Sequence, residues 1–313
     1  MKVLVAGATG ALGKQLVPRL VTNGHQVAGT TRSSTKRLML RDLGATPVIM
    51  DALDPDSVAR AVAEVEPDVI VHELTALSGS LDMRHFDRDF AQTNRLRTEG
   101  TDHLLAASRA VGIRRFVAQS FAGWPSGRTG GPVKTEDDPL DTEPAAAMRS
   151  GLEAIRHLEE AVTGAEWTDG VVLRYGGFYG PGISFDRDGE HVELLRRRKF
   201  PVVGDGGGVW SFVHIEDAAD ATVAAVERGR RGIYNVVDDE PAPVAEWLPA
   251  AATAVGAKPP RRVPRWAGRL LAGEAATFMM TEMRGASNEK AKRELGWQPR
   301  HASWRQGFAE VAA

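Results

Sequence analysis

The chain has 313 residues, of which 42% are hydrophobic and 26% charged, and its 39 basic and 41 acidic side chains give a net charge of −2. This composition is typical of a globular protein with a large core, and the length suits one domain with an added lobe or two domains. The near-zero charge argues against nucleic acid as the main partner. Because cysteine is absent, disulfides, thiolate metal ligands and a cysteine nucleophile are excluded.

No segment has the pattern of a membrane anchor or a secretory signal. The apolar run at 2–6 is not preceded by a basic region, and no uninterrupted apolar stretch reaches about 18 residues. We therefore expect a cytoplasmic protein that acts on a small-molecule substrate, with neither nucleic acid nor a membrane as a partner. A homodimer is compatible with the sequence.

Short apolar runs alternate with amphipathic segments along the first half of the chain. The alternation indicates the α/β class with a doubly wound parallel sheet. Asp54 followed by Pro55 is typical of a helix N-cap and a first helical residue. The apolar runs predict strands at 2–6, 26–30, 47–50, 68–72, 115–119 and 170–175. Apolar residues at three- and four-residue spacing predict helices at 11–22, 35–43, 55–65, 86–111 and 148–163.

The composition changes after Arg174. Residues 175–189 are rich in glycine and aromatic residues, and from Pro241 onward prolines, arginines and tryptophans are scattered among short helical segments. We therefore expect a smaller C-terminal substrate lobe beside the sheet domain. The expected boundaries are 1–175 with 209–236 for the sheet domain, and 176–208 with 237–313 for the lobe.

The first strand runs into three glycines in the stretch VLVAGATGALGKQL, residues 3–16. A strand, a tight turn and a helix in this order are the context in which a glycine-rich turn binds a dinucleotide. One glycine permits the turn, the second lets a pyrophosphate approach the backbone, and the third lets the helix pack on the strand. The sequence therefore predicts a Rossmann dinucleotide-binding domain whose loop holds the cofactor through Gly7, Thr9, Gly10, Ala11, Leu12 and Gly13.

The end of the second strand bears on the choice of cofactor. An NAD site usually has a carboxylate here for the ribose hydroxyls, whereas this chain has Thr31 and Arg32. A hydroxyl and a fixed cation suit a 2′-phosphate, so NADP is favoured over NAD, which stays an alternative. A solvated surface arginine is the other interpretation of Arg32.

Six stretches in the same order along the chain resemble the extended short-chain dehydrogenase/reductases of the NAD(P)-dependent epimerase/dehydratase type. They are the segments MDALDPDSV, PDVIVHELTA, EGTDHLLAASRAVGIRRFVAQS, VVLRYGGFYGPG, WSFVHIEDAADATVAAVERG and SNEKAKRELGWQPR. The resemblance implies that the adenine contacts Asp51, Ala52 and Leu53. It also implies that the cofactor passes beside the strand tips at Glu73, Leu74 and Thr75 and at Tyr175.

The chain departs from this family at the residues that carry its chemistry. Members use a Tyr-x-x-x-Lys pair, in which the lysine lowers the tyrosine pKa for proton exchange, and an upstream Ser or Thr that orients the carbonyl. Alignment of EPAAAMRSGLEAIRHLEEA with this pattern places Ala147 at the tyrosine and Gly151 at the lysine. The stretch FVAQSFAGW places Phe121 at the Ser/Thr position, with Ser120 one residue earlier.

Other polar side chains are candidates to replace the missing proton donor. We expect catalytic residues among Tyr175, Tyr179, Ser120 and His191. The structural alternatives are core packing for Tyr179 and a solvated helix face for His191. No metal site is expected.

Three functions fit these observations. The first is an NADP-dependent oxidoreductase or epimerase that acts on a small carbonyl or alcohol with an unusual proton donor. Trp124, Phe178 and Phe185 favour a hydrophobic substrate. The second is a non-redox dehydratase, cyclase or isomerase on the same fold, and the third is a binding protein that senses the nucleotide.

Overall fold

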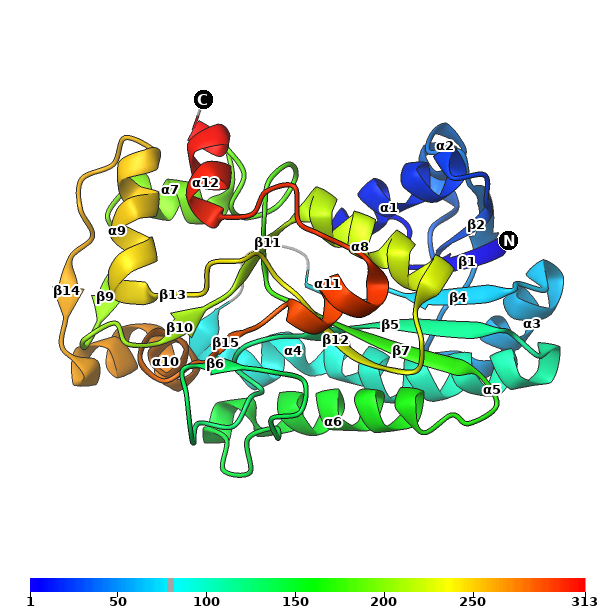
Figure 1. Ribbon diagram of the computed structural model, residues 1–313, viewed down its shortest axis with the longest axis horizontal. Helices are drawn as coiled ribbons and strands as arrows, with labels where there is room; N and C mark the ends of the chain where they lie inside the picture. The colour runs from blue at the N-terminus through cyan, green and yellow to red at the C-terminus, as the bar shows by residue number, and fades with distance from the viewer. Residues whose placement is uncertain (78–81, 313) are drawn as a thin grey trace.

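The structure, a computed structural model, describes residues 1–77 and 82–312. A parallel sheet of seven strands fills one side of the molecule, and a smaller lobe lies beside it (Figure 1). The strand order is β12-β7-β5-β4-β1-β2-β3, so the chain reverses its direction of winding between β1 and β4. These strands are β1 (Lys2–Ala6), β2 (Gln26–Thr31), β3 (Thr46–Ile49), β4 (Val69–His72), β5 (Arg115–Phe121), β7 (Asp169–Tyr175) and β12 (Gly232–Val236).

Helices cover both faces of the sheet, as expected for strands that are apolar on both sides. One face carries α1 (Ala11–Thr22), α2 (Arg37–Asp42) after the short turn η1 (Ser34–Lys36), α8 (Ile215–Arg228) and α11 (Glu289–Leu295). The other carries α3 (Pro55–Val65), α4 (Phe86–Arg95), α5 (Thr101–Val111) and α6 (Arg149–Thr163). The α/β class and the parallel sheet are confirmed.

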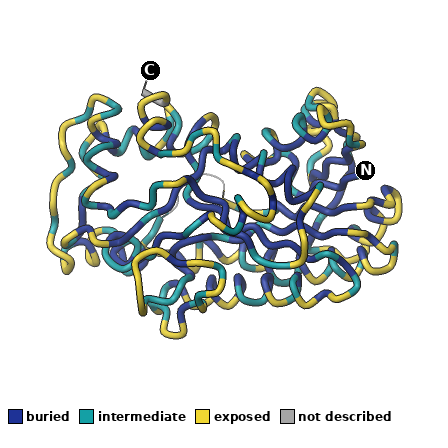
Figure 2. Tube along the Cα trace, in the orientation of Figure 1, coloured by how far each residue is buried: buried dark blue, intermediate teal, exposed yellow. Residues whose placement is uncertain are grey.

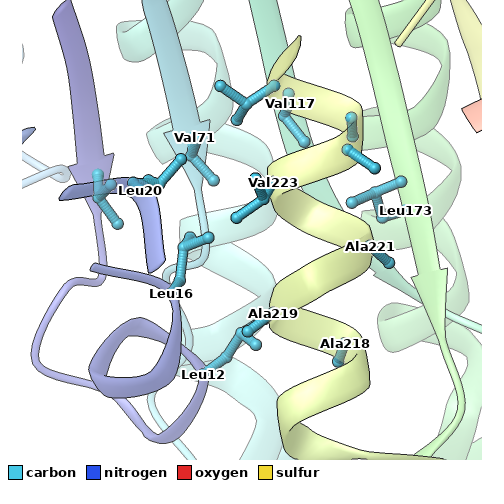
Figure 3. Close-up of a cluster of buried hydrophobic side chains, with 14 of the residues drawn as sticks. Leu12, Leu16, Leu20, Val71, Val117, Leu173, Ala218, Ala219, Ala221 and Val223 are labelled. Atoms are coloured by element: carbon cyan, nitrogen blue, oxygen red, sulfur yellow. The ribbon is translucent and has the colours of Figure 1, made fainter. Parts of the chain in front are cut away.

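The core beneath α1 and α8 shows why these sequences pack together (Figure 3). The leucines of α1 recur at three- to four-residue spacing and point at the sheet, while α8 presents alanines that let the two helices approach closely. Strand valines and Leu173 complete the layer. The residues are Leu12, Leu16, Leu20, Val71, Val117, Leu173, Ala218, Ala219, Ala221 and Val223.

Local sequence signals fix several element boundaries. The Asp54 side chain accepts hydrogen bonds from the backbone N–H groups of Asp56 and Ser57 at 3.0 and 3.2 Å, and Pro55 is the first residue of α3. These hydrogen bonds confirm the predicted N-cap at Asp54. The predicted helix over 86–111 is continuous but contains a π-helical turn, η3 (Leu96–Gly100), between α4 and α5.

The lobe is built from short helices and paired short strands around an aromatic core. Buried Phe212, Trp247 and Trp304 lie at its centre. Its helices are α7 (Glu190–Arg196), α9 (Val244–Ala254), α10 (Arg265–Thr281) and α12 (Trp304–Ala312). The strand pairs are β8 (Gly177–Tyr179) with β11 (Phe212–His214), β9 (Val202–Val203) with β14 (Arg262–Val263), and β10 (Val209–Trp210) with β13 (Ala242–Pro243).

Two further details concern the edge between domain and lobe. The strands β6 (Val133–Lys134) and β15 (Gly285–Ala286) pair there, and the turns η2 (Met83–His85) and η4 (Ala146–Met148) precede α4 and α6. Although α11 belongs to the C-terminal segment, it packs on α8 and β12 with Ala291 and Leu295 in the sheet-domain core.

Burial is continuous along the strands, and exposure concentrates on loops and outer helix faces (Figure 2). Among the described helices, none combines the length and apolarity needed to cross a bilayer.

Candidate functional site

The glycine-rich turn lies where β1 ends and α1 begins. Gly7 has φ of +98°, and a Cβ there would lie 2.6 Å from the carbonyl oxygen of Glu73, the residue after β4. A Cβ at Gly13 would lie 2.7 Å from the backbone of Ala8. The fold itself therefore requires these two glycines, one for the turn and one for the close approach of helix and strand.

Gly10 differs from its two neighbours in the motif. It is exposed, and a Cβ there would have only the Gly7 carbonyl oxygen nearby, at 3.2 Å. Gly10 is also the N-cap of α1, which has no side-chain cap and no acidic residue in its first turn. The positive end of the helix is thus left uncompensated at an accessible position, as an anion-binding helix terminus requires.

The ends of β2, β3 and β4 supply the remaining predicted cofactor contacts. Thr31 is buried and its Oγ1 accepts a hydrogen bond from the Ser33 N–H at 3.1 Å, whereas the exposed Arg32 has no hydrogen bond or ion pair within the described ranges. Asp51 accepts from the Leu53 N–H at 3.1 Å. The structure brings all of these to the carboxyl edge of one parallel sheet, at the β1–β4 reversal where such folds bind ligands.

Ala52, Leu74 and Thr75 lie at the same edge. Ala52 is buried and its carbonyl oxygen accepts from Nδ1 of His103 at 2.9 Å, while the Leu74 N–H lies 3.3 Å from Nδ1 of His72. Thr75 is exposed. Their roles in cofactor binding stay predictions.

An apolar cluster occupies the positions at which the family resemblance places a tyrosine, a lysine and a Ser or Thr. Ala147 is half-buried in η4, Gly151 is buried in the first turn of α6, and Phe121 ends β5. A Cβ at Gly151 would lie 3.2 Å from Cη2 of Trp124 and 3.5 Å from Cε1 of Phe86. The two rings thus occupy the space into which a longer side chain at Gly151 would extend.

The rings of this cluster pack edge to face. The centroids of Phe86 and Trp124 are 5.6 Å apart at 82°, and Phe90 stacks on Phe86 at 4.1 Å. We call this group the aromatic cluster. Its members are Phe86, Phe90, Trp124, Met148, Leu152, Ile155, Ala275, Phe278 and Met283, with Met83, Phe121, Leu140, Ala145, Ala147, Trp210 and Met279 partly buried against them.

Ser120 is not a member of this cluster. Its hydroxyl donates to Oε1 of Glu159 at 2.7 Å, and the same carboxylate accepts from Nε and Nη2 of Arg174 at 2.7 and 2.5 Å. All three side chains are buried. The Glu159–Arg174 ion pair and the Ser120 hydroxyl connect β5 and β7 to α6. This is a structural role for Ser120.

Tyr175 forms a buried hydrogen-bonded group on the opposite face of the sheet. Its hydroxyl lies 3.1 Å from Oε1 of Glu73 and 2.7 Å from Oγ1 of Thr222, and the Thr222 hydroxyl donates to the Ala218 carbonyl at 2.7 Å. One tyrosine proton cannot serve both neighbours, so complete pairing requires a proton on Glu73. Burial, partly opposed by the Tyr175 hydrogen bond, raises the pKa of Glu73 to about 8.

Tyr179 and His191 lie in the lobe. Tyr179 is fully buried against His214 and Phe308, and burial raises the pKa of its hydroxyl. His191 packs against Phe185, and burial lowers the pKa of its imidazole. The structure therefore does not bring the four predicted catalytic residues together, and their catalytic role stays a prediction.

Sequence reasoning placed Glu73 at a strand tip beside the cofactor but did not single it out as a site residue, and it did not name Phe86. Glu73 follows the apolar strand VIVH directly, and a carboxylate at that position in a parallel sheet is a signal for a site residue. Phe86 reaches Gly151 only through the packing of α4 on α6. No local pattern reveals such a contact.

One group of three residues has the composition of a metal site. Ligand atoms of His214, Asp217 and His301 all lie within 4.8 Å of one another. The Asp217 carboxylate already accepts hydrogen bonds from the N–H groups of Arg300 and His301 at 3.0 and 2.8 Å, and from Nδ1 of His301 at 2.9 Å. These bonds join α8 to the segment before α12 and account for the cluster without an ion.

The surface also has a hollow of about 690 Å³ away from the glycine-rich turn. Arginines at the amino ends of β5, β7 and β12 line it, among them Arg114, Arg115 and Arg231, together with Asp169. The amino and carboxyl ends of parallel strands lie at opposite edges of a sheet. This hollow is therefore remote from the turn and from the aromatic cluster.

Comparison with known proteins gives concordant matches. The family model for the NAD dependent epimerase/dehydratase family matches residues 3–237. A Streptomyces "3-diazoavenalumate denitrifying reductase" is 44% identical over 98% of this chain and 99% of its own length. A Stenotrophomonas maltophilia "2-alkyl-3-oxoalkanoate reductase" is 32% identical over 82% of this chain and 76% of its own.

The fold also matches solved structures. The Thermus thermophilus UDP-glucose 4-epimerase in complex with NAD superimposes with a TM-score of 0.74 at 26% identity, covering 100% of this chain and 98% of that one.

Proposed function

The chain belongs to the NAD dependent epimerase/dehydratase family, and from that premise we propose that it is an NADPH-dependent reductase that transfers hydride without a tyrosine proton donor. The observation that supports this proposal is the packing of Phe121, Ala147 and Gly151 within the aromatic cluster, because the predicted alignment places these three residues at the proton-relay positions. A substrate that accepts hydride without taking up a proton from the enzyme is the chemistry that such a site can serve.

The cofactor fits the carboxyl edge of the sheet. The pyrophosphate would meet the backbone at Gly10 and the uncompensated end of α1. The guanidinium of Arg32, which has no partner within residues 1–77 and 82–312, would hold the 2′-phosphate. Asp51 and Leu53 would line the adenine site. A bound NADPH supplies a hydride.

The type of acceptor follows from counting protons. Carbonyl reduction joins one hydride and one proton to C=O, so it needs a donor such as the tyrosine of the Tyr-x-x-x-Lys pair. An arenediazonium ion, Ar–N₂⁺, needs only the hydride. The addition gives Ar–N=NH, which breaks its C–N bond to yield Ar–H and N₂, so atoms and charge balance without an enzyme acid.

The name of the 44% identical relative supports this class of substrate, since it specifies a diazo compound and a denitrifying reduction. We therefore propose reductive loss of N₂ from an aromatic diazo compound. The hydrophobic side chains of the aromatic cluster suit an arene better than a sugar.

The test is NADPH oxidation with a panel of arenediazonium salts and a matched panel of aryl ketones and aldehydes, each corrected for the rate without enzyme. We expect turnover with the diazonium salts, formation of the parent arene, and no turnover with the carbonyl compounds. Faster reduction of the carbonyl panel would contradict the proposal. Undiminished conversion with NADP⁺ in place of NADPH would identify a non-redox enzyme instead.

A further inference from the structure

None of the hydrophobic side chains that make up the aromatic cluster, all within the described part of the chain, is a tyrosine, and the chain contains no cysteine. The three tyrosines of the chain lie elsewhere: Tyr175 with Glu73, Tyr179 in the lobe, and Tyr234 on β12 with its hydroxyl on the Arg230 carbonyl at 3.0 Å. The buried Lys134, on β6, has its Nζ 3.3 Å from Oδ1 of Asp138.

Part of the cluster is reachable from outside. Phe121, Ala147 and Trp210 are half-buried, whereas Phe86 and Trp124 behind them are buried. The Trp210 indole N–H donates to the Met279 carbonyl at 2.8 Å, which fixes that ring. The half-buried residues are thus aromatic rings and a methyl group backed by further rings. Two charged groups border them, because Oε2 of Glu274 accepts from the Ala147 N–H at 3.3 Å and the Arg128 guanidinium lies 5.9 Å from the centre of the Phe278 ring.

Such a surface has a chemical consequence for the substrate proposed above. The terminal nitrogen of an arenediazonium ion is an electrophile. A phenol ring attacks it to form an azo bond and releases a ring proton, and a primary amine forms a triazene. A tyrosine with a lowered pKa beside a lysine, as in the family pattern, would present both nucleophiles to the substrate.

Resting on that proposed function, we propose that the aromatic cluster is a docking surface for a cationic, electrophilic arene. The replacement of phenol and amine by Ala147 and Gly151 prevents the enzyme from being captured by its own substrate. The Phe121 and Trp210 rings hold the cation by their π faces, an interaction that needs no nucleophile. The proposed substrate therefore requires a site that has neither a tyrosine nor a lysine at these two positions.

The experiment restores a phenol to the cluster. Ala147→Tyr is compared with Ala146→Tyr, whose position is exposed and lies in the same tryptic peptide, residues 135–149. Each variant is exposed to 4-methoxybenzenediazonium without NADPH, and azo adducts on that peptide are measured over time by mass spectrometry. Anisole, the expected denitrified product, serves as the competitor, and Ala147→Phe controls for side-chain bulk.

We expect adduct formation at Ala147→Tyr to saturate with reagent and to be slowed by anisole. It should be about tenfold faster than at Ala146→Tyr, because binding holds the electrophile next to the tyrosine and raises its effective concentration there. Ala147→Phe should stay unmodified on this peptide. Equal, unsaturated and anisole-insensitive rates at the two positions would overturn the proposal. Phe121→Tyr, nearly isosteric with the wild-type residue, repeats the test on peptide 116–128 if Ala147→Tyr fails to fold.

The result is independent of the proposed reductase activity. Saturable, anisole-protected coupling in Ala147→Tyr together with no NADPH oxidation by wild type would support the docking surface and contradict the reductase. Turnover by wild type without preferential coupling in either variant would support the reductase and contradict the docking surface.

Discussion

Replacing Glu73 by glutamine probes the buried group beneath the carboxyl edge of the sheet. The substitution keeps the shape of the side chain, and the amide still provides a donor for the Tyr175 oxygen. Burial raises the pKa of Glu73 from 4.5 to about 8 in the folded protein. A raised pKa means that the stability contributed by the protonated group is fully present below pH 4.5 and is lost as the pH rises through about 8.

The magnitude follows from the difference between the folded and unfolded pKa. Between about pH 5 and pH 8, this group lowers the free energy of unfolding of the wild type by roughly 3–4 kcal/mol. Glutamine does not titrate, so this loss disappears in Glu73→Gln. We therefore expect the variant to gain a similar amount, roughly 3–4 kcal/mol, relative to wild type over that interval.

The assay is urea denaturation of both proteins at a series of pH values. Other titrating groups, such as the buried Asp238 and His72, are present in both proteins and cancel in the difference. Glu64→Gln, at an exposed position on α3, is the matched control and should leave the difference flat. A flat difference for Glu73→Gln, or a variant that loses stability as the pH rises, would refute the reasoning.

Substitutions at three further positions test the cofactor site and the aromatic cluster. Arg32→Ala should weaken NADPH binding by roughly 1.5–3 kcal/mol and NADH binding little, because only NADPH carries the 2′-phosphate; equal weakening in a titration would contradict that role. Gly10→Val should abolish binding of both cofactors with an unchanged circular dichroism spectrum, and native affinity would place the phosphates elsewhere. Gly151→Lys should lower the free energy of unfolding by about 3 kcal/mol or more, since an unpaired ammonium would enter apolar space beside Trp124. In the same urea titration Gly151→Ala should stay within about 1 kcal/mol of wild type, because a gain in helix propensity offsets a tight contact; equal stability of the two variants would show that the lysine side chain avoids the cluster.

The parts of the fold that depend on local signals could be predicted from the sequence. The strand–turn–helix unit around Gly7 and Gly13 carries its own glycine pattern, and α3 begins at the predicted Asp54 cap. Each of the six predicted strands appears within two residues of its expected bounds, because apolar runs flanked by amphipathic helices have few alternatives in an α/β fold.

The interior of the site could not be predicted in this way. Glu73 and Tyr175 are 102 residues apart, at the ends of β4 and β7, which are separated in the sheet by β5. Gly151 meets Phe86 and Trp124 only because α4 and the segment after β5 both pack on α6. The sequence predicts that the tyrosine and lysine are missing, and tertiary packing shows which side chains surround Ala147 and Gly151.

The most direct test of hydride transfer without a proton donor is to follow nitrogen and cofactor in one reaction. A methoxybenzenediazonium salt with ¹⁵N at the terminal position is mixed with NADPH and enzyme. Labelled N₂ is recorded by membrane-inlet mass spectrometry while NADPH absorbance is followed, at several pH values between about 6 and 8. The account predicts one N₂ released for each NADPH oxidised, at an enzyme-dependent rate that does not change with pH. Release of more than one N₂ for each NADPH oxidised would contradict it, and so would an enzymatic rate that falls steeply as the pH rises.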